Sequence, residues 1–544
     1  MKNIKYLFVT IVLGLTLTSC GDSFLTQYPE GGVLLQDQFD KLPDNLKGSI
    51  MGIYSKMYEY GDEHDAFGQR AIDMYGDIQS GDMAMKKAGY GWFEVYEMGQ
   101  FYAYAGGYLW SYYYDMLNLI NISLIAVEAN QKEIIDTMSE GGTPTAVIQE
   151  QGYYYGQLLT LRGWAYAYLL NYFCDPMDQL ANPKDQELAI PVYTEVEVKA
   201  GTLGTYRSTV AEVYDRIYED LSLGIELLDF YGPLNQRGSK LEVDADVARV
   251  ILAYALLNHG DKDDKIYEGD TKNAYQMALK FASEAINNGK YPIMKQSELT
   301  TTGFSNVDAA NWMWGEDVTV ETTTGLASFF GQVDIHTYSY AAAGDTKTID
   351  GNLYDEIVAH AWDARVNWFN SDNVKFPYCP EGKFYNPSTK NETSLKKVDR
   401  NWLCDNIFMR IEVAYLIAAE AAWANGDEAT AVSYLQQLCS ERIIPGKESE
   451  FTTWLAGLSG DALKKAIIYN WRVEMWGEGY GLQTLRRLNK KVTLGKNHLH
   501  RANAELDITS KAYEEFQCEI PSSETRYNPN LNNRMNTNNL IHKY

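Results

Sequence analysis

Apolar and small residues recur at helical spacing across residues 409–442, and this segment organises the predicted fold. Five alanines within residues 414–422 would let a neighbouring helix approach closely. Gly426 can end the first helix without a Cβ penalty, and Asp427 can cap a second helix. This order of large, small and turn residues is typical of a tetratricopeptide repeat, a helix pair that stacks on further pairs to bury its apolar faces.

The same spacing predicts helices over most of the chain. Single helices are expected at residues 46–60 and 109–130. Helix pairs are expected from residues 157–173 with 209–230, from 244–259 with 271–288, and as a fourth pair from 461–474 with 479–489. Thr209 and Glu212 have the spacing of a capping box. The predicted fold class is all-α dominated, with about four tetratricopeptide-like helix pairs.

Two segments interrupt this pattern. Residues 61–107 are rich in Gly, Tyr and acidic side chains and have little helical period, which predicts a long loop of the kind that often carries function. Residues 293–400 are rich in Thr, Gly, Asn, Asp and aromatic side chains, which predicts short strands and loops. We interpret the second segment as a loop-rich insertion within a single domain that spans residues 20–544.

The first twenty residues predict a membrane-anchored protein. Two lysines precede the apolar residues 6–17, a stretch too short to span a membrane comfortably and typical of a secretory signal. The stretch ends in Leu-Thr-Ser-Cys, which resembles a bacterial lipobox. We therefore expect residues 1–19 to be a signal peptide and Cys20 to carry lipid. A coincidental cysteine in an ordinary signal peptide is the alternative.

Composition excludes several classes of protein. The chain has 73 acidic and 47 basic residues, a formal net charge of −26, which disfavours nucleic acid and anionic lipid as partners. Five cysteines besides Cys20 form no CxxC motif, so neither a disulfide framework nor a zinc site is predicted. Cys439 is expected in the core. No P-loop, GxSxG or HExxH motif occurs, so no cofactor or catalytic nucleophile is predicted.

Short motifs over nearly the whole chain resemble the SusD/RagB family of surface lipoproteins. They are Asp-Ser-Phe-Leu at 22–25 with Pro29, Leu-Arg-Gly-Trp-Ala-Tyr at 161–166, Met-Arg-Ile-Glu through Ala-Glu-Ala at 409–421, Trp-Arg-Val-Glu through Glu-Gly at 471–479, and Ile-Pro through Asn-Pro-Asn-Leu at 520–531. Trp471 and Tyr480 depart from the charged residues common in the family. Both departures are expected to affect helix packing.

The resemblance implies a single α-rich domain with four repeat units supporting a loop-rich binding half. Such proteins capture an oligosaccharide, or less often a peptide, at the outer-membrane surface and act as a lid over a SusC-like TonB-dependent transporter. It therefore implies a glycan-binding protein without enzymatic activity. A helical-repeat adaptor for proteins or peptides is the first alternative, and an enzyme is the second.

Several charged residues allow two interpretations. The carboxylates Glu412, Glu420, Glu474 and Glu478 could form catalytic pairs, but the resemblance favours buried ion pairs with Arg410 and Arg472. The acidic residues Asp261, Asp263, Asp264 and Glu268 suggest calcium, but an EF-hand requires Gly at the position of Ile266, so a solvated turn is favoured. His498 and His500 are expected in an exposed turn, so no metal site is predicted.

Aromatic side chains outside the helices are the remaining candidates for ligand contact. A pyranose has an apolar C–H face that can stack on Trp or Tyr while polar groups bind its rim. The candidate glycan-binding residues are Tyr90, Trp92 and Tyr96 in the first loop and Phe329, Tyr338 and Tyr340 in the insertion. Tyr338 and Tyr340 alternate, so a strand would place both rings on one face.

Overall fold

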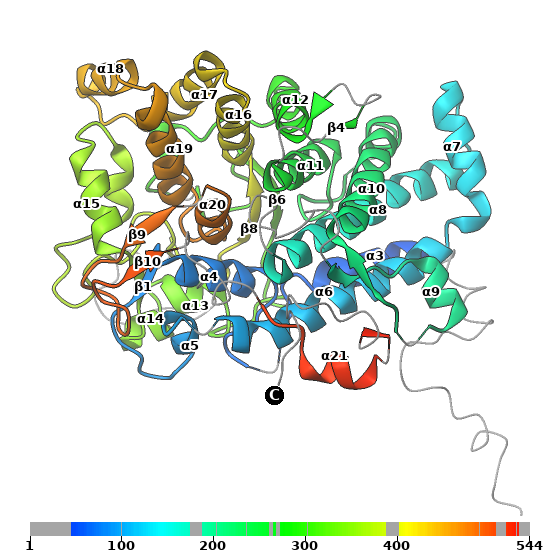
Figure 1. Ribbon diagram of the computed structural model, residues 1–544, viewed down its shortest axis with the longest axis horizontal. Coiled ribbons are helices and arrows are strands. Elements are labelled where there is room, and N and C mark those ends of the chain that lie inside the picture. The colour runs from blue at the N-terminus through cyan, green and yellow to red at the C-terminus, as the bar shows by residue number, and fades with distance from the viewer. Residues whose placement is uncertain are drawn as a thin grey trace, which may run out of the picture.

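The computed structural model describes residues 45–531 except 62, 100, 175–187, 203, 236, 261–264, 268–271, 302, 388–401, 489, 508–517 and 529. Helices dominate this part of the chain, and its strands occur only in two-stranded pairs (Figure 1). Within the described part, no helix is both long enough and apolar enough to cross a membrane.

The predicted helix pairs are confirmed and form a row across the upper part of the molecule (Figure 1). The members of this repeat region are α8 (Ala146–Phe173) with α10 (Val210–Tyr231), α11 (Ala245–His259) with α12 (Ala274–Asn287), α16 (Glu412–Ala424) with α17 (Glu428–Ser440), and α19 (Gly460–Glu474) with α20 (Gly481–Arg487). α10 packs on α11, α12 on α16 and α17 on α19, so each pair covers the next.

Local sequence explains how these helices begin and how closely they pack. Thr209 and Glu212 form the predicted capping box at the start of α10. Gly426 has a φ of +84°, and the Asp427 side chain accepts a hydrogen bond from the Thr430 N–H. A Cβ on Gly163 would lie 2.6 Å from Leu221 Cγ, so glycine is what allows α10 to lie against α8 at this point.

The predicted loop at 61–107 is wrong over much of its length. It contains α4 (Gln69–Ser80) and α5 (Glu94–Glu97), and α6 (Phe101–Ile125) begins before its end. Every residue of α4 is buried. Its charged side chains have partners inside the protein: Arg70 pairs with Asp73 at 2.8 Å, and Asp77 accepts hydrogen bonds from the Gly479 and Gly481 N–H groups. Gly68 and Gly81 bound α4, and it lies in a Gly-rich and acidic segment, so composition outweighed its helical spacing in the prediction.

Further helices complete the described chain. They are α3 (Leu46–Ser55), α7 (Gln131–Glu140), α9 (Glu195–Ala200), α13 (Phe329–Val333), α14 (Tyr340–Ala343), α15 (Gly351–Ala359), α18 (Glu448–Ala456) and α21 (Ser522–Tyr527), with 3₁₀ turns at Glu128–Asn130, Gln296–Glu298 and Ala364–Trp368. The insertion at 293–400 therefore holds more helix than expected.

Short strands occur in the insertion, as predicted, but they pair with segments outside it. The antiparallel pairs are β1 (Met83–Met85) with β7 (Lys347–Ile349), β2 (Leu188–Pro191) with β3 (Arg207–Thr209), β4 (Lys265–Tyr267) with β5 (Lys272–Asn273), β6 (Trp312–Glu316) with β8 (Asn406–Arg410), and β9 (Lys491–Thr493) with β10 (Glu505–Asp507). β6 and β7 thus attach the insertion to the repeat region and to the N-terminal segment.

The carboxylates considered as catalytic lie in the core as ion pairs. Arg410 contacts Glu474 at 2.6 Å, Glu478 at 2.8 Å and Glu412 at 3.5 Å, and all four side chains are buried. Burial alone would raise the pKa of Glu474, but the charges of Arg442 and Arg410 outweigh it and hold this pKa well below its usual range. The prediction of buried ion pairs is confirmed for these residues.

Other predictions about single residues have mixed outcomes. Glu420 is also buried but pairs with Arg487 at 2.6 Å, and Arg472 pairs with Asp82 at 2.6 Å, so the expected partnership of Arg472 with these glutamates is wrong. Cys439 is buried, as predicted. Trp471 and Tyr480 are buried too, with ring centroids 5.6 Å apart, which confirms their role in packing. Cys20 and the acidic positions 261–264 and 268 lie outside the described residues.

Candidate functional site

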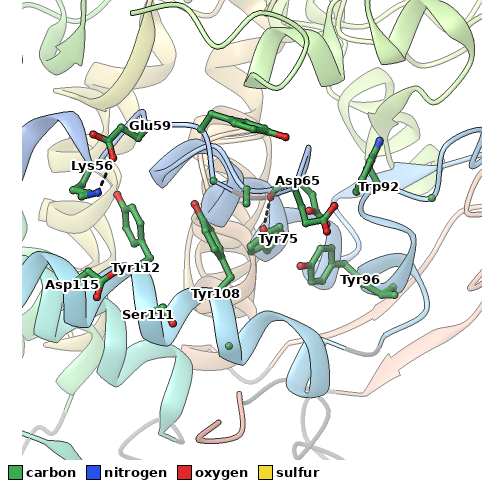
Figure 2. A pocket seen from close by; sticks show the side chains of 17 residues that line it. Lys56, Glu59, Asp65, Tyr75, Trp92, Tyr96, Tyr108, Ser111, Tyr112 and Asp115 are labelled. Atoms are coloured by element: carbon green, nitrogen blue, oxygen red, sulfur yellow. Dashed lines mark hydrogen bonds and ion pairs between the residues drawn. The ribbon is translucent and has the colours of Figure 1, made fainter. Parts of the chain in front are cut away.

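A cleft of about 850 Å³ opens between α6, the segment after α3 and the loop before α5 (Figure 2). Its size is within the range of small-molecule sites. Its lining combines aromatic rings with carboxylates. The aromatic residues are Tyr60, Tyr75, Trp92, Tyr96, Tyr108 and Tyr112, the acidic ones are Glu59, Glu63, Asp65 and Asp115, and Lys56 is the basic one.

One face of α6 forms a wall of the cleft. Tyr108, Ser111, Tyr112 and Asp115 follow one another at intervals that place them on the same side of a helix. Figure 2 shows the rings of Tyr108 and Tyr112 rising from α6 toward the segment after α3. This spacing is readable in the sequence, but the other face of α6 is apolar as well, so the sequence reasoning assigned the whole helix to packing.

A glycine holds the segment after α3 in place. Gly68 has a φ of +75°, and a Cβ there would lie 2.1 Å from the Met57 carbonyl oxygen. The Gly68 N–H donates to the Tyr108 hydroxyl at 3.0 Å, and the next N–H, of Gln69, donates to the Met57 carbonyl at 2.8 Å. The segment from Lys56 to Gly68 is therefore fixed at both ends against its neighbours.

Buried charged side chains fix the loop before α5 and α5 itself. Phe93 has a φ of +68° and a buried ring, with the Lys347 ammonium 5.1 Å from its centroid. Glu97 is buried and lies 2.9 Å from His498 Nδ1, and His498 Nε2 lies 3.2 Å from Asp350. Such an anchor keeps the three aromatic residues between Gly91 and Glu97 in a fixed position.

The environment of His498 corrects a prediction. This side chain is buried, so its expected place in an exposed turn is wrong, whereas His500 is partly exposed and contacts Glu94 at 2.8 Å. Burial alone would lower the pKa of His498, but its hydrogen bonds to Asp350 and Glu97 raise the pKa above its ordinary value. Among the described residues, no group of His, Cys, Asp and Glu could hold a metal ion.

Four of the six predicted aromatic residues lie at or beside the cleft. Trp92 and Tyr96 line it. Trp92 stacks on His64 with centroids 5.2 Å apart, and His64 contacts Tyr340, whose ring lies 5.0 Å from that of Tyr90. His64 is a connecting residue that sequence reasoning missed, because a lone histidine in a loop carries no pattern.

Exposure separates these four residues into two kinds. Tyr90 is 57% exposed, whereas Tyr96 and Tyr340 are 4% and 9% exposed. Tyr96 packs on Tyr75 with centroids 4.3 Å apart, so it supports the cleft wall from behind. Trp92, half-buried at the rim, combines a large ring with access to the cleft.

The other two predicted residues lie elsewhere. Phe329 is 1% exposed and packs under the Arg70 guanidinium, 4.0 Å from its ring centroid, so it has no free face for a sugar. Tyr338 is 42% exposed but does not line the cleft. The expected strand over Tyr338 and Tyr340 is wrong, because the Ser339 hydroxyl accepts from the Ala342 N–H and starts helix α14.

Burial changes the ionisation of the cleft. It raises the pKa of both Asp65 and Asp115, against the lowering effect of nearby lysines. Burial also raises the pKa of Tyr108 to about 12, although the hydrogen bond from Gly68 opposes the change. The Tyr108 hydroxyl therefore stays protonated near neutral pH and can donate a hydrogen bond. Aromatic faces, hydroxyl donors and carboxylate acceptors together suit a polyhydroxylated ligand.

Comparison with known families agrees with this fold. Residues 43–252 match a family model described as starch-binding associating with the outer membrane, and residues 366–543 match the model of the SusD family. The chain belongs to the SusD/RagB family. Two models of this family thus match the two ends of the described chain, including most of the repeat helices of this SusD/RagB protein.

Solved structures share its fold at low sequence identity. A SusD-like carbohydrate binding protein from Bacteroides vulgatus superposes with a TM-score of 0.67 at 20% identity, over 90% of this chain and 97% of that one. SusD superfamily proteins from Bacteroides thetaiotaomicron and Bacteroides fragilis give TM-scores of 0.66 and 0.67 at 19% and 18% identity, over 90% of this chain and 98% and 99% of theirs. No curated protein matches the sequence.

Proposed function

We propose that this SusD/RagB protein captures an oligosaccharide in the cleft of α6 at the cell surface and passes it to a SusC-like TonB-dependent transporter. The observation that carries the proposal is the cleft itself, where Trp92 and several tyrosines share a surface with carboxylates. Membership of the SusD/RagB family supports it. So does the fold shared with a protein named as a carbohydrate binding protein.

The lining explains how a sugar would bind without chemistry. A pyranose would place its apolar C–H face on Trp92 or the exposed Tyr60, whose exposed fraction is 46%. Its hydroxyls would donate to Glu63, Asp65 or Asp115 and accept from tyrosine hydroxyls. The four glutamates considered as catalytic lie outside this cleft in buried ion pairs, which favours binding over hydrolysis.

An array of oligosaccharides tests the site directly. We expect the wild type to retain at least one class of chain, Trp92→Ala to weaken this retention severalfold, and Tyr60→Ala to weaken it less. A stacked aromatic ring contributes about 1 kcal/mol, which corresponds to roughly fivefold in affinity. Tyr527→Ala is the matched control, because Tyr527 is 73% exposed and lies outside the cleft.

The rival functions predict different results. A protein-binding adaptor would show no sugar-dependent retention, and an enzyme would release shorter products from the retained chain. Retention that is equal in wild type and Trp92→Ala would remove the cleft of α6 from the proposal.

We further propose that lipid on Cys20 anchors the protein to the outer membrane, with residues 21–44 between the lipid and α3. Cys20→Ala is expected to move the protein from the membrane fraction to the soluble fraction. Mass spectrometry of the N-terminus checks the modification, and an unlipidated wild type that stays in the membrane fraction would contradict it. Co-purification of a TonB-dependent transporter from solubilised membranes tests the hand-off.

A further inference from the structure

The cleft of α6 carries more negative charge than its own cation can neutralise. Four carboxylates line it, from Glu59, Glu63, Asp65 and Asp115, against the single cation of Lys56. Lys56 is already paired with Glu59 at 2.8 Å. The other three carboxylates have no such partner among the described residues. No basic nitrogen in the described part of the chain lies within 4 Å of Glu63, Asp65 or Asp115.

Partial burial makes these charges effective. Asp65 and Asp115 are both partly withdrawn from water, and this withdrawal raises the pKa of each. Nearby lysines offset this rise only in part, so a positive group placed beside either carboxylate would interact with it favourably. An added negative group would meet repulsion from three carboxylates in the same space.

A second group in the cleft lacks a partner. The Tyr112 hydroxyl is buried and makes no hydrogen bond to any residue that the structure describes, and Tyr112 itself is 9% exposed. Figure 2 shows its ring rising from α6 beside Lys56 and Glu59. Buried hydroxyls are almost always hydrogen-bonded in native proteins, so this atom indicates a site that a polar ligand completes.

We infer that the cleft selects its glycan by charge, favouring chains with amino sugars, accepting neutral chains and rejecting chains with uronate or sulfate groups. This inference rests on the proposed function, since it assigns the class of sugar to the same cleft. Glu63 and Asp115 are the selective residues. Their side-chain carboxylates accept no hydrogen bond from any described residue, so their charge is not needed to hold the fold.

The net charge of the whole chain gives a competing explanation that the experiment must separate. At −26, the protein attracts cationic polymers at any acidic patch of its surface. A local effect is distinguished by removing two charges from the cleft in one variant and two charges from elsewhere in another. Glu226 on α10 and Asp355 on α15 serve as the control positions. Both are exposed, neither lines the cleft, and they match the residue types of Glu63 and Asp115.

The test uses an array of neutral, amino-sugar, uronate and sulfated oligosaccharides at low salt, with three proteins. These are the wild type, the double variant Glu63→Gln with Asp115→Asn, and the control Glu226→Gln with Asp355→Asn. We expect the wild type to retain no uronate or sulfated chain and to prefer amino-sugar chains over neutral ones by roughly twofold to fivefold, the range of partly screened ion pairs. The cleft variant should lose this preference, and the control should keep it.

Each outcome decides one of the two proposals. Retention of uronate or sulfated chains by the wild type overturns charge selection. Equal loss of the preference in the cleft variant and in the control would assign the preference to the net charge of the protein. That result would also overturn charge selection by the cleft. Retention of neutral chains without any preference for amino sugars also overturns it but leaves the proposed function standing. Failure to retain any chain, with circular dichroism showing a folded protein, contradicts the proposed function.

Discussion

The repeat region and the cleft of α6 treat charge in opposite ways. Glu474 is the last residue of α19. Its carboxylate lies 2.7 Å from Arg442, 2.6 Å from Arg410 and 3.1 Å from Arg365, and all four side chains are buried. In the cleft, Glu63 and Asp115 are without such partners among the described residues. Buried charges must be matched for the fold to form, whereas unmatched charges at a surface remain available to a ligand.

The largest expected effect comes from breaking the matched set. Glu474→Ala would leave three buried guanidinium groups around a missing carboxylate, because Arg365, Arg410 and Arg442 all contact it. We expect the free energy of unfolding to fall by about 3–5 kcal/mol, the range for removal of one partner from a buried pair. Chemical denaturation followed by circular dichroism measures it.

The control for this variant is Glu226→Ala, which removes an exposed carboxylate from α10. It should change the free energy of unfolding by less than about 0.5 kcal/mol. If Glu474→Ala were as mild as the control, the buried network would contribute nothing to stability and the contrast with the cleft would fail.

The next effect tests packing in the repeat region. Ala419 is fully buried in α16, where α12, α17 and α19 meet this helix. Ala419→Trp should overpack the contact and reduce the free energy of unfolding by roughly 1–3 kcal/mol or more. Ala429→Trp on the exposed side of α17 is the matched control. A melting temperature equal to that of the control would show that the repeat register is wrong.

The same contrast explains what the sequence could predict. The repeat helices have small residues where neighbours touch and caps such as Thr209 and Asp427, and these signals are local. Their pairing followed from the spacing alone. Helix α4 is the counter-example, because it lies between Gly68 and Gly81 in a Gly-rich segment and its Arg70 donates to the distant Gly477 carbonyl.

The cleft could be predicted only in part, for a related reason. Trp92 was predicted as a ligand-contact residue because it lies outside a periodic segment beside glycines, and it lines the cleft. Tyr108, Tyr112 and Asp115 were missed, because a helix that packs on one side and lines a cleft on the other shows the same spacing as a core helix. The prediction that Phe329 contacts a ligand is wrong, because the Arg70 guanidinium covers its ring. Only the fold brings these two residues together.

The smallest expected effect sharpens the comparison through pH. His498 joins the end of α5 to the N-cap of α15, with Glu97 on Nδ1 and Asp350 on Nε2. Its pKa in the folded protein is raised above the ordinary 6.5, so its contribution to stability is fully present below about pH 6.5 and is lost as the pH rises through the raised value.

In His498→Gln this loss cannot occur. We expect the difference in free energy of unfolding between wild type and variant to shrink as the pH rises above 6.5, when the two are compared by denaturation at several pH values. His360→Gln is the control for the loss of an imidazole, because His360 stacks on Tyr469 in the repeat region and its Nδ1 lies against the Glu356 carbonyl. A His498→Gln curve that ran parallel to that of the wild type would show that the cleft loop is held without a charged bridge, and its stability would then depend on packing, as that of the repeat region does.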